Sequence, residues 1–189
     1  APFGLETDYK NGWIGRYHAL QSKLKTVNVN PAIAFKVLER LSVGFGLQAQ
    51  YATAELSNAI DFGSIAAVIP ALQLIAQPTQ QDGRGRIEGD AWAFGYTAGL
   101  LYEPWQGTRF GVGYRSAIKH NLKGDARFRL DHTVGPAIAA GSGAFAPTGA
   151  RAKLNLPEMI SLGAHHDIDD QWSVMGEAAW TRWSRFDEL

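Results

Sequence analysis

The chain contains no cysteine and has no excess of charge of either sign. None of its 189 residues is a cysteine, and 18 lysines and arginines balance 18 aspartates and glutamates. The absence of cysteine excludes a disulfide framework and a thiolate metal site. The balanced charge offers no general attraction to nucleic acid or to an anionic membrane surface. We therefore expect no nucleic-acid partner.

Long apolar runs are also missing. The longest apolar stretch, Ile65–Ile75, is interrupted by Pro70 and Gln73, whereas a transmembrane helix needs about 20 apolar residues. The first residues have no basic segment followed by an apolar one, so no secretory signal peptide is visible. The end at Trp183–Leu189 falls within a strand-like pattern. We expect the chain to be a fragment of a longer protein.

Recognisable catalytic and cofactor motifs are absent. The sequence has no phosphate-binding loop or dinucleotide fingerprint, and Gly141-Ser142-Gly143 lacks the spacing of a nucleophile elbow. His165 and His166 are neighbours in a predicted strand, so their side chains face opposite sides and a shared metal ion is not expected. We predict neither a cofactor nor an enzyme.

The dominant pattern is an alternation of apolar and small or polar residues with period two. It is clearest over Arg109–Lys123, where one face is apolar and the other is small or cationic, as in an extended strand. The apolar face of this segment comprises Phe110, Val112, Tyr114, Ile118 and Leu122. Similar segments cover residues 25–37, 42–54 and 90–102, with less regular ones near 154–166 and 172–183, the former interrupted by Pro157-Glu158.

The predicted connections alternate between short and long. Short polar turns are expected at 38–40, 103–107 and 167–170, and long loops at 61–86 and 127–153. Strands of about ten residues joined in this way are typical of outer-membrane barrels. Aromatic residues near strand ends fit interfacial girdles: Trp92, Tyr102, Trp105 and Trp172. The alternative is a water-soluble β-sandwich, with strands of about 5–6 residues and the apolar face inside.

Specific strings, in order along the chain, resemble the FadL family of outer-membrane long-chain fatty acid transporters. They comprise Ala1–Leu5, Trp13–Tyr17, Val29–Ala34, Leu41–Gly46, Tyr102–Pro104, Gly113–Ser116 and Leu154–Met159. The resemblance implies an all-β, transmembrane antiparallel β-barrel of about fourteen strands, with short helical pieces in the extracellular loops. Residues 1–189 are expected to form a single domain with roughly half of that barrel. The N-terminal hatch and the last strands are expected to lie outside it.

The resemblance also implies a function and partners. The expected activity is passive transport of long-chain fatty acids, or of aromatic hydrocarbons, through the outer membrane of a Gram-negative bacterium. The ligand is captured in an extracellular loop groove and released through a lateral opening in the barrel wall. Outer-membrane lipid and lipopolysaccharide are the expected surroundings, and a monomer is expected. An outer-membrane lipase-type enzyme is the alternative, with His120 on the outward face as its one rough catalytic candidate.

The first long loop carries the expected ligand contacts. Its apolar residues have the i, i+3, i+4 spacing of a helix, which Pro70 limits to two short pieces. The predicted ligand-binding residues are Phe62, Ile65, Val68, Ile69, Leu72 and Ile75, with Phe145 from the second loop. Ordinary packing of the stripe on the barrel rim is the alternative. The Gly/Ala-rich second loop, Val134–Ala152, either forms the facing wall or is mobile.

Two further sets of residues complete the predicted site. Lys36, Arg115 and Lys119 are expected in the lumen, where they pair with a fatty acid carboxylate or neutralise acids such as Glu177. The family has a basic residue at the position of Asn58, and this departure allows a less polar ligand. The resemblance places the lateral opening at Pro2, Phe3 and Gly4, where Pro and Gly suit a broken strand.

Overall fold

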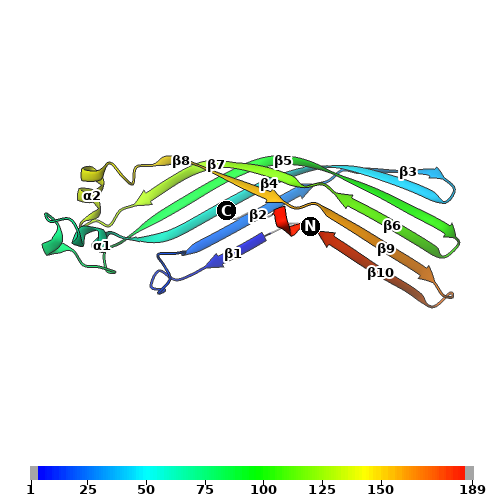
Figure 1. Cartoon of the computed structure of the whole chain (residues 1–189), viewed down its shortest axis with the longest axis horizontal. Coiled ribbons are helices and arrows are strands. Elements are labelled where there is room, and N and C mark those ends of the chain that lie inside the picture. Colours follow the sequence, from blue (N-terminus) through cyan, green and yellow to red (C-terminus); the bar gives the residue numbers. More distant parts are fainter. Residues whose placement is uncertain (1–3, 186–189) are drawn as a thin grey trace. The chain divides into compact units, whose positions relative to one another are not determined.

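The computed structural model describes residues 4–185, most of which form antiparallel strands (Figure 1). The predicted all-β, antiparallel fold class is confirmed. The elements are β1 (Gly4–Asp8), β2 (Gln21–Val29), β3 (Ala32–Leu38), β4 (Leu41–Asp61), α1 (Phe62–Ala67), the 3-10 helix η1 (Gln73–Ile75), β5 (Asp82–Trp105), β6 (Thr108–Arg115), β7 (Ile118–Arg129), α2 (Gly135–Ser142), β8 (Thr148–Leu156), β9 (Met159–Asp167), β10 (Ser173–Thr181) and the 3-10 helix η2 (Trp183–Arg185).

The strands form one sheet in which all the described pairings are antiparallel. The hydrogen-bonded order is β1-β2-β4-β5-β6-β9-β10, with β3 on β4 and with β7 on β5 and β8. Three predicted strands are each divided into two. Asn30 and Pro31 separate β2 from β3, Ser116 and Ala117 separate β6 from β7, and Pro157 and Glu158 separate β8 from β9. The prolines account for two of these breaks because proline has no backbone N–H to donate.

The chain divides into two compact units, and five of the described strands have residues in both: β2, β4, β5, β7 and β8. The first unit comprises residues 4–26, 52–91 and 122–152 of the described chain, and it holds α1, η1 and α2. The second comprises 27–51, 92–121 and 153–185, and it holds the short turns of the hairpins. Nothing among the described helices is long and apolar enough to cross a bilayer.

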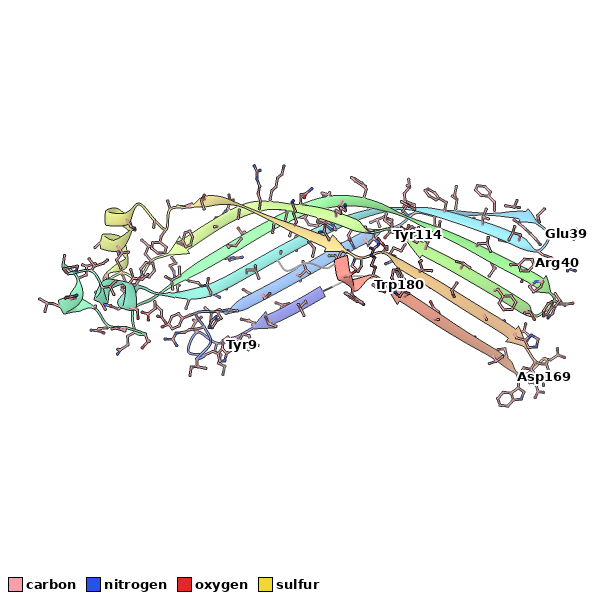
Figure 2. All side chains as sticks on the ribbon, viewed as in Figure 1. Tyr9, Glu39, Arg40, Tyr114, Asp169 and Trp180 are labelled. Carbon is pink, nitrogen blue, oxygen red and sulfur yellow. The ribbon has the colours of Figure 1, made fainter. Side chains whose placement is uncertain are left out.

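The hairpin turns of the second unit are as short as predicted. Residues Glu39 and Arg40 join β3 to β4, and the β9–β10 turn carries Asp169 (Figure 2). One Asp169 carboxylate oxygen accepts hydrogen bonds from the backbone N–H groups of Gln171 and Trp172, both at 2.8 Å, which fixes the turn locally. Gly107 closes the β5–β6 turn with φ +82°, a conformation that favours glycine.

The sheet of the second unit exposes its apolar face. Phe94 is 75% exposed, whereas Gln48 on the adjacent strand is 1% exposed. Along this exposed face Phe45, Tyr96 and Tyr114 form a row across β4, β5 and β6, with ring centroids 6.3 and 5.8 Å apart. A water-soluble sandwich would show the reverse arrangement, with aromatic faces buried and amides in water. The predicted outward apolar face of a membrane barrel fits this distribution.

The segment Arg109–Lys123 was predicted to be one continuous strand, but the structure has a β-bulge in it, between β6 and β7. Arg115 pairs with Thr97 and Lys123 pairs with Asp90, so eight residues of one strand face seven of the other. The extra residue exchanges the faces: Phe110 and Val112 are exposed, whereas Ile118, His120 and Leu122 are buried. The predictions that Ile118 and Leu122 share the face of Phe110, and that His120 faces outward, are therefore wrong.

Candidate functional site

The first long loop begins with a capped helix. Asp61 precedes α1, and its carboxylate accepts hydrogen bonds from Ser64 N at 2.9 Å and Ser64 Oγ at 2.6 Å, as an N-cap residue does. The Thr79 N–H also donates to it at 3.0 Å. Burial disfavours the charged form, but these hydrogen bonds outweigh burial and lower the pKa of Asp61. The carboxylate therefore ties the start of this loop to its end.

The loop forms two short helical pieces, as the position of Pro70 predicted. Helix α1 ends before Val68, and η1 begins at Gln73. The returning chain is fastened by Gln81, whose side chain donates to Ile75 O at 3.0 Å and accepts from Gln77 N at 2.8 Å. This buried amide thus has partners on both sides, which holds the loop closed at its base.

The second long loop forms helix α2, one of the short helical pieces expected in the long loops. Asp131 accepts hydrogen bonds from Thr133 N and Val134 N at 2.8 and 3.0 Å. Despite its burial, these bonds lower the pKa of Asp131, so it stays ionised ahead of the helix. At the other end Gly143 caps the helix with φ +66°, and its N–H donates to Ala139 O at 2.9 Å.

The two loops pack together and enclose an apolar groove of about 490 Å³. Their shared core consists of Phe62, Ala66, Val134 and Ile138, all buried. The second loop therefore forms the facing wall, one of its two predicted roles. The groove is lined by Ile65, Ile69, Ala71, Leu72, Ala137, Ile138, Gly141, Ser142, Ala144 and Phe145.

The predicted ligand contacts fall into three groups. Ile65, Ile69, Leu72 and Phe145 line the groove. Phe62 is fully buried beneath it, in edge contact with Phe145 at a centroid distance of 5.0 Å. Val68 and Ile75 are outside the lining set and are exposed, at 77% for Val68. Contact of any of these residues with a ligand stays a prediction.

Sequence reasoning missed most of the wall that α2 supplies. Ala137, Gly141 and Ala144 line the groove through small side chains and backbone, and such residues give no amphipathic signal. The lining residues include no charged side chain. The one hydroxyl, Ser142 Oγ, donates to Ile138 O at 2.7 Å. The groove can therefore hold a ligand by apolar contact alone.

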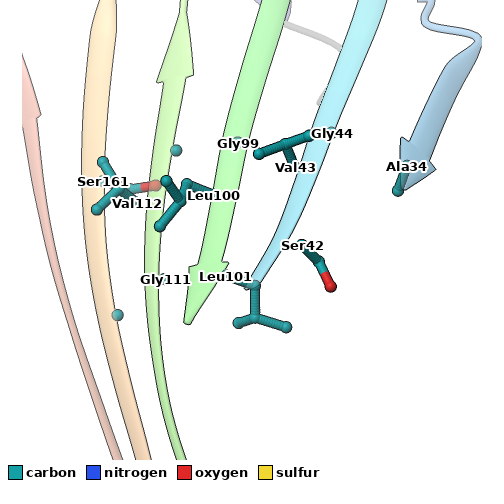
Figure 3. Close-up of a pocket in the computed structure, with 12 residues that line it drawn as sticks. Ala34, Ser42, Val43, Gly44, Gly99, Leu100, Leu101, Gly111, Val112 and Ser161 are labelled. Carbon is teal, nitrogen blue, oxygen red and sulfur yellow. The ribbon is translucent and has the colours of Figure 1, made fainter. Parts of the chain in front are cut away.

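A second groove, of about 410 Å³, lies on the sheet of the second unit (Figure 3). It crosses several strands where small residues meet side by side: Gly44 pairs with Ala34, and Gly113 pairs with both Gly99 and Ser161. Figure 3 shows Leu101 and Ser42 beside these small residues. The face opposite the exposed aromatic rows is thus largely bare backbone.

The predicted lumen cations divide between two faces. Lys36 is two residues from Ala34 in β3, and Arg115 is two residues from Gly113 in β6. Residues two apart in a strand share a face, and Ala34 and Gly113 line the second groove, so Lys36 and Arg115 lie on the face of that groove. Lys119 lies on the other face of its strand, because its neighbours Ile118 and His120 are buried and it is exposed. Within residues 4–185, Lys36 and Arg115 form no salt bridge with Glu177. Their role toward a carboxylate stays a prediction.

Asn58 lies below the loop groove on the same unit. Its side-chain amide donates to Tyr17 O at 3.3 Å and Ala59 O at 3.2 Å. Of the residues predicted at the lateral opening, Pro2 and Phe3 lie outside the described residues. Gly4 begins the short strand β1, where it pairs with Lys25.

An ion pair missed in the sequence connects the β1–β2 loop to the base of the first long loop. Arg16 Nε donates to Asp82 Oδ2 at 2.6 Å, and Tyr17 Oη donates to Asp82 Oδ1 at 2.8 Å. Arg16 also donates to Thr79 O at 2.8 Å. The partners are 66 positions apart in sequence, so no local pattern reveals the pairing.

Tyr17 should titrate unusually late. Burial, followed by the hydrogen bond to Asp82 and the charges of Asp61 and Asp82, raises its pKa to about 12, whereas an unfolded tyrosine titrates near ~10. The stability from this shift is complete below about pH 10 and disappears as pH rises through the folded pKa. In ultraviolet titrations of the tyrosines, the native protein should show one tyrosine that ionises near pH 12, and Tyr17→Phe should lack it. Loss of a component near ~10 instead would contradict the buried network, and the denatured proteins serve as the control.

Comparison with known proteins gives a consistent result. A family model described as "Outer membrane protein transport protein (OMPP1/FadL/TodX)" matches residues 1–189. The long-chain fatty acid transport protein of Salmonella typhi is 32% identical over 194 residues, which cover 99% of this chain and 44% of that protein. The chain thus spans less than half the length of this curated relative.

Solved structures share the fold. The crystal structure of a Pseudomonas aeruginosa FadL homologue is 26% identical with a TM-score of 0.79, covering 96% of this chain and 43% of that one. The Ralstonia pickettii toluene transporter TbuX is 20% identical with a TM-score of 0.67, covering 97% of this chain and 50% of that one.

Proposed function

The chain belongs to the outer membrane protein transport family, and on that premise we propose that its whole protein carries long-chain fatty acids passively across the outer membrane. Aromatic or other hydrocarbons are the alternative cargo. Members of this family are transporters and channels, which argues against an enzyme. The observation that carries the proposal is the uncharged groove between the two long loops.

The groove suits the first step of such transport. Fatty acids and hydrocarbons are poorly soluble, so an apolar surface outside the membrane concentrates them. Each methylene group removed from water contributes about 0.8 kcal/mol, and a volume of about 490 Å³ lies within the range of small-molecule sites. The absence of a charged lining residue means that an alkyl chain and an aromatic ring are both acceptable ligands.

The exposed apolar face of the sheet supports a location in the outer membrane. On β5 this face runs through alternate residues from Trp92 to Tyr102. With a rise of about 3.3 Å per residue and a tilt of about 40°, such a row spans roughly 25 Å, the height of the apolar band of an outer-membrane barrel. Outer-membrane lipid and lipopolysaccharide are then its surroundings, and we propose that the protein acts as a monomer.

We propose that release is lateral, near Pro2, Phe3 and Gly4. The support is the match of this segment to the family model, together with its Pro and Gly, which suit a broken strand. An opening beside it would let an apolar ligand enter the bilayer without crossing water, which avoids the cost of exposing the alkyl chain again.

Transport by the full-length protein in liposomes tests the proposal. Uptake of labelled oleate, and separately of toluene, should be faster than in protein-free liposomes. Uptake of oleate alone would identify fatty acids as the cargo, and uptake of toluene alone would identify hydrocarbons. Proteoliposomes that take up neither faster than the protein-free control would refute the transport function.

A further inference from the structure

Phe145 has a position unlike that of the other groove residues. It lines the groove, and its ring also contacts Phe62 and Phe128, with centroid distances of 5.0 and 5.6 Å and interplanar angles of 62° and 79°. Phe62 belongs to the buried core of the loops, whereas Phe128 belongs to strand β7. The ring therefore stands between the groove and the strands beneath it.

The strands below Phe145 continue the apolar surface. Phe128 lies beside Gly85, Ile60 and Asn58: a Cβ built on Gly85 would be 3.1 Å from Asn58 Oδ1, 3.5 Å from Ile60 and 3.7 Å from Phe128. Ile60 also packs against the core of the loops. Neither Phe128 nor Ile60 is among the groove residues. The Phe145 ring therefore contacts this surface and also lines the groove.

The backbone around Phe145 is suited to movement. Phe145 has φ +63°, in the left-handed region that side-chain-bearing residues rarely adopt. Gly143, two residues earlier, has φ +66°, and a Cβ built on it would meet no atom within 4 Å. A few residues that absorb a change of backbone angle are sufficient to swing a side chain. Apolar packing holds the ring in place, through its two aromatic contacts and the core of the loops.

From this geometry we propose that Phe145 is the gate between the capture groove and the apolar surface of Ile60 and Phe128. In the closed state its ring fills the floor of the groove against Phe62 and Phe128. Rotation about the 143–145 segment opens the floor and lets an apolar ligand leave the groove downward. The inference rests on the proposed transport function for its ligand, but the gate itself can be detected without transport.

The first test separates binding from passage. Phe145→Leu keeps an apolar side chain in the wall but loses both ring contacts, so groove affinity for a fluorescent fatty acid should fall modestly, because Phe145 itself lines the groove. Uptake by proteoliposomes of the full-length protein should become several-fold faster. The matched control, Ile65→Ala, trims the wall away from Phe128 and should lower affinity and uptake together. Parallel changes in Phe145→Leu would identify a structural wall and overturn the gate.

The second test needs no transport. This chain has no cysteine, so Ile60→Cys provides a unique reporter once any cysteine elsewhere in the full-length protein is replaced. Labelling by N-phenylmaleimide added outside should be several-fold faster when Phe145→Leu is also present, and unchanged by Ile65→Ala. Equal labelling in both backgrounds would overturn the gate. Absence of uptake by the wild type with accelerated labelling would refute the transport function and leave the gate supported.

Discussion

Replacing Ile69 with aspartate is expected to weaken ligand capture by more than tenfold. Ile69 lines the groove and packs against the shared core of the two loops. Loss of contact with two methylene groups alone costs about 1.6 kcal/mol, which is about tenfold in affinity. A carboxylate facing an apolar ligand adds the cost of its own desolvation. Equilibrium binding of a fluorescent fatty acid to the full-length protein measures the loss.

The neighbouring residue supplies the control. Val68 is one position away in the same loop, is 77% exposed and does not line the groove. Val68→Asp should therefore bind the ligand as the wild type does. Circular dichroism and loop proteolysis establish that both variants keep their fold. Equal binding by Ile69→Asp and the wild type would mean that the apolar stripe of this loop only packs the rim.

Placing an arginine at Ala98 is expected to destabilise the protein in lipid by about 2–4 kcal/mol. Ala98 pairs with Tyr114 and lies near the middle of the exposed row from Trp92 to Tyr102. Its short side chain is replaced without loss of a large packing contact. A guanidinium at this depth must leave water or drag water into the bilayer. Unfolding by denaturant in phospholipid vesicles measures the change.

Ala98→Leu is the matched control for this substitution. It adds bulk at the same position without charge, so its stability in vesicles should remain close to that of the wild type. A penalty of similar size for both variants would point to crowding between Ala98 and its neighbours. An Ala98→Arg protein as stable in vesicles as the wild type would contradict the assignment of this face to lipid.

The strand faces were predictable because their signal is local. Alternation of apolar and small residues places Phe45 and Leu47 on one face of β4, and the structure exposes both. The bulge at Ser116–Ala117 could not be predicted, because the apolar residues before and after it all stand at even-numbered positions, as they would in one regular strand. Only the pairing with β5 shows the extra residue.

Most of the predictable site is one wall of the groove, since Phe145 is the single predicted lining residue from the other wall. Ile65, Ile69 and Leu72 stand out as large apolar residues in helical spacing, and all three line the groove. The opposite wall depends on Ala137 and Gly141, whose small size is informative only after α2 is placed. The Arg16–Asp82 pair also requires the fold, because its charges come from segments distant in sequence.

The bulge between β6 and β7 has a consequence for how this segment can change in length. In a loop, loss of one residue usually alters little, since connections tolerate insertions and deletions. At the bulge, removal of Ala117 would take out the extra residue, so seven residues would face seven, with Phe110 and Val112 still facing outward and His120 and Leu122 still facing inward. This position should therefore tolerate loss of a single residue, whereas loss of one residue from a regular part of β7 would turn the side chains beyond it to the other face.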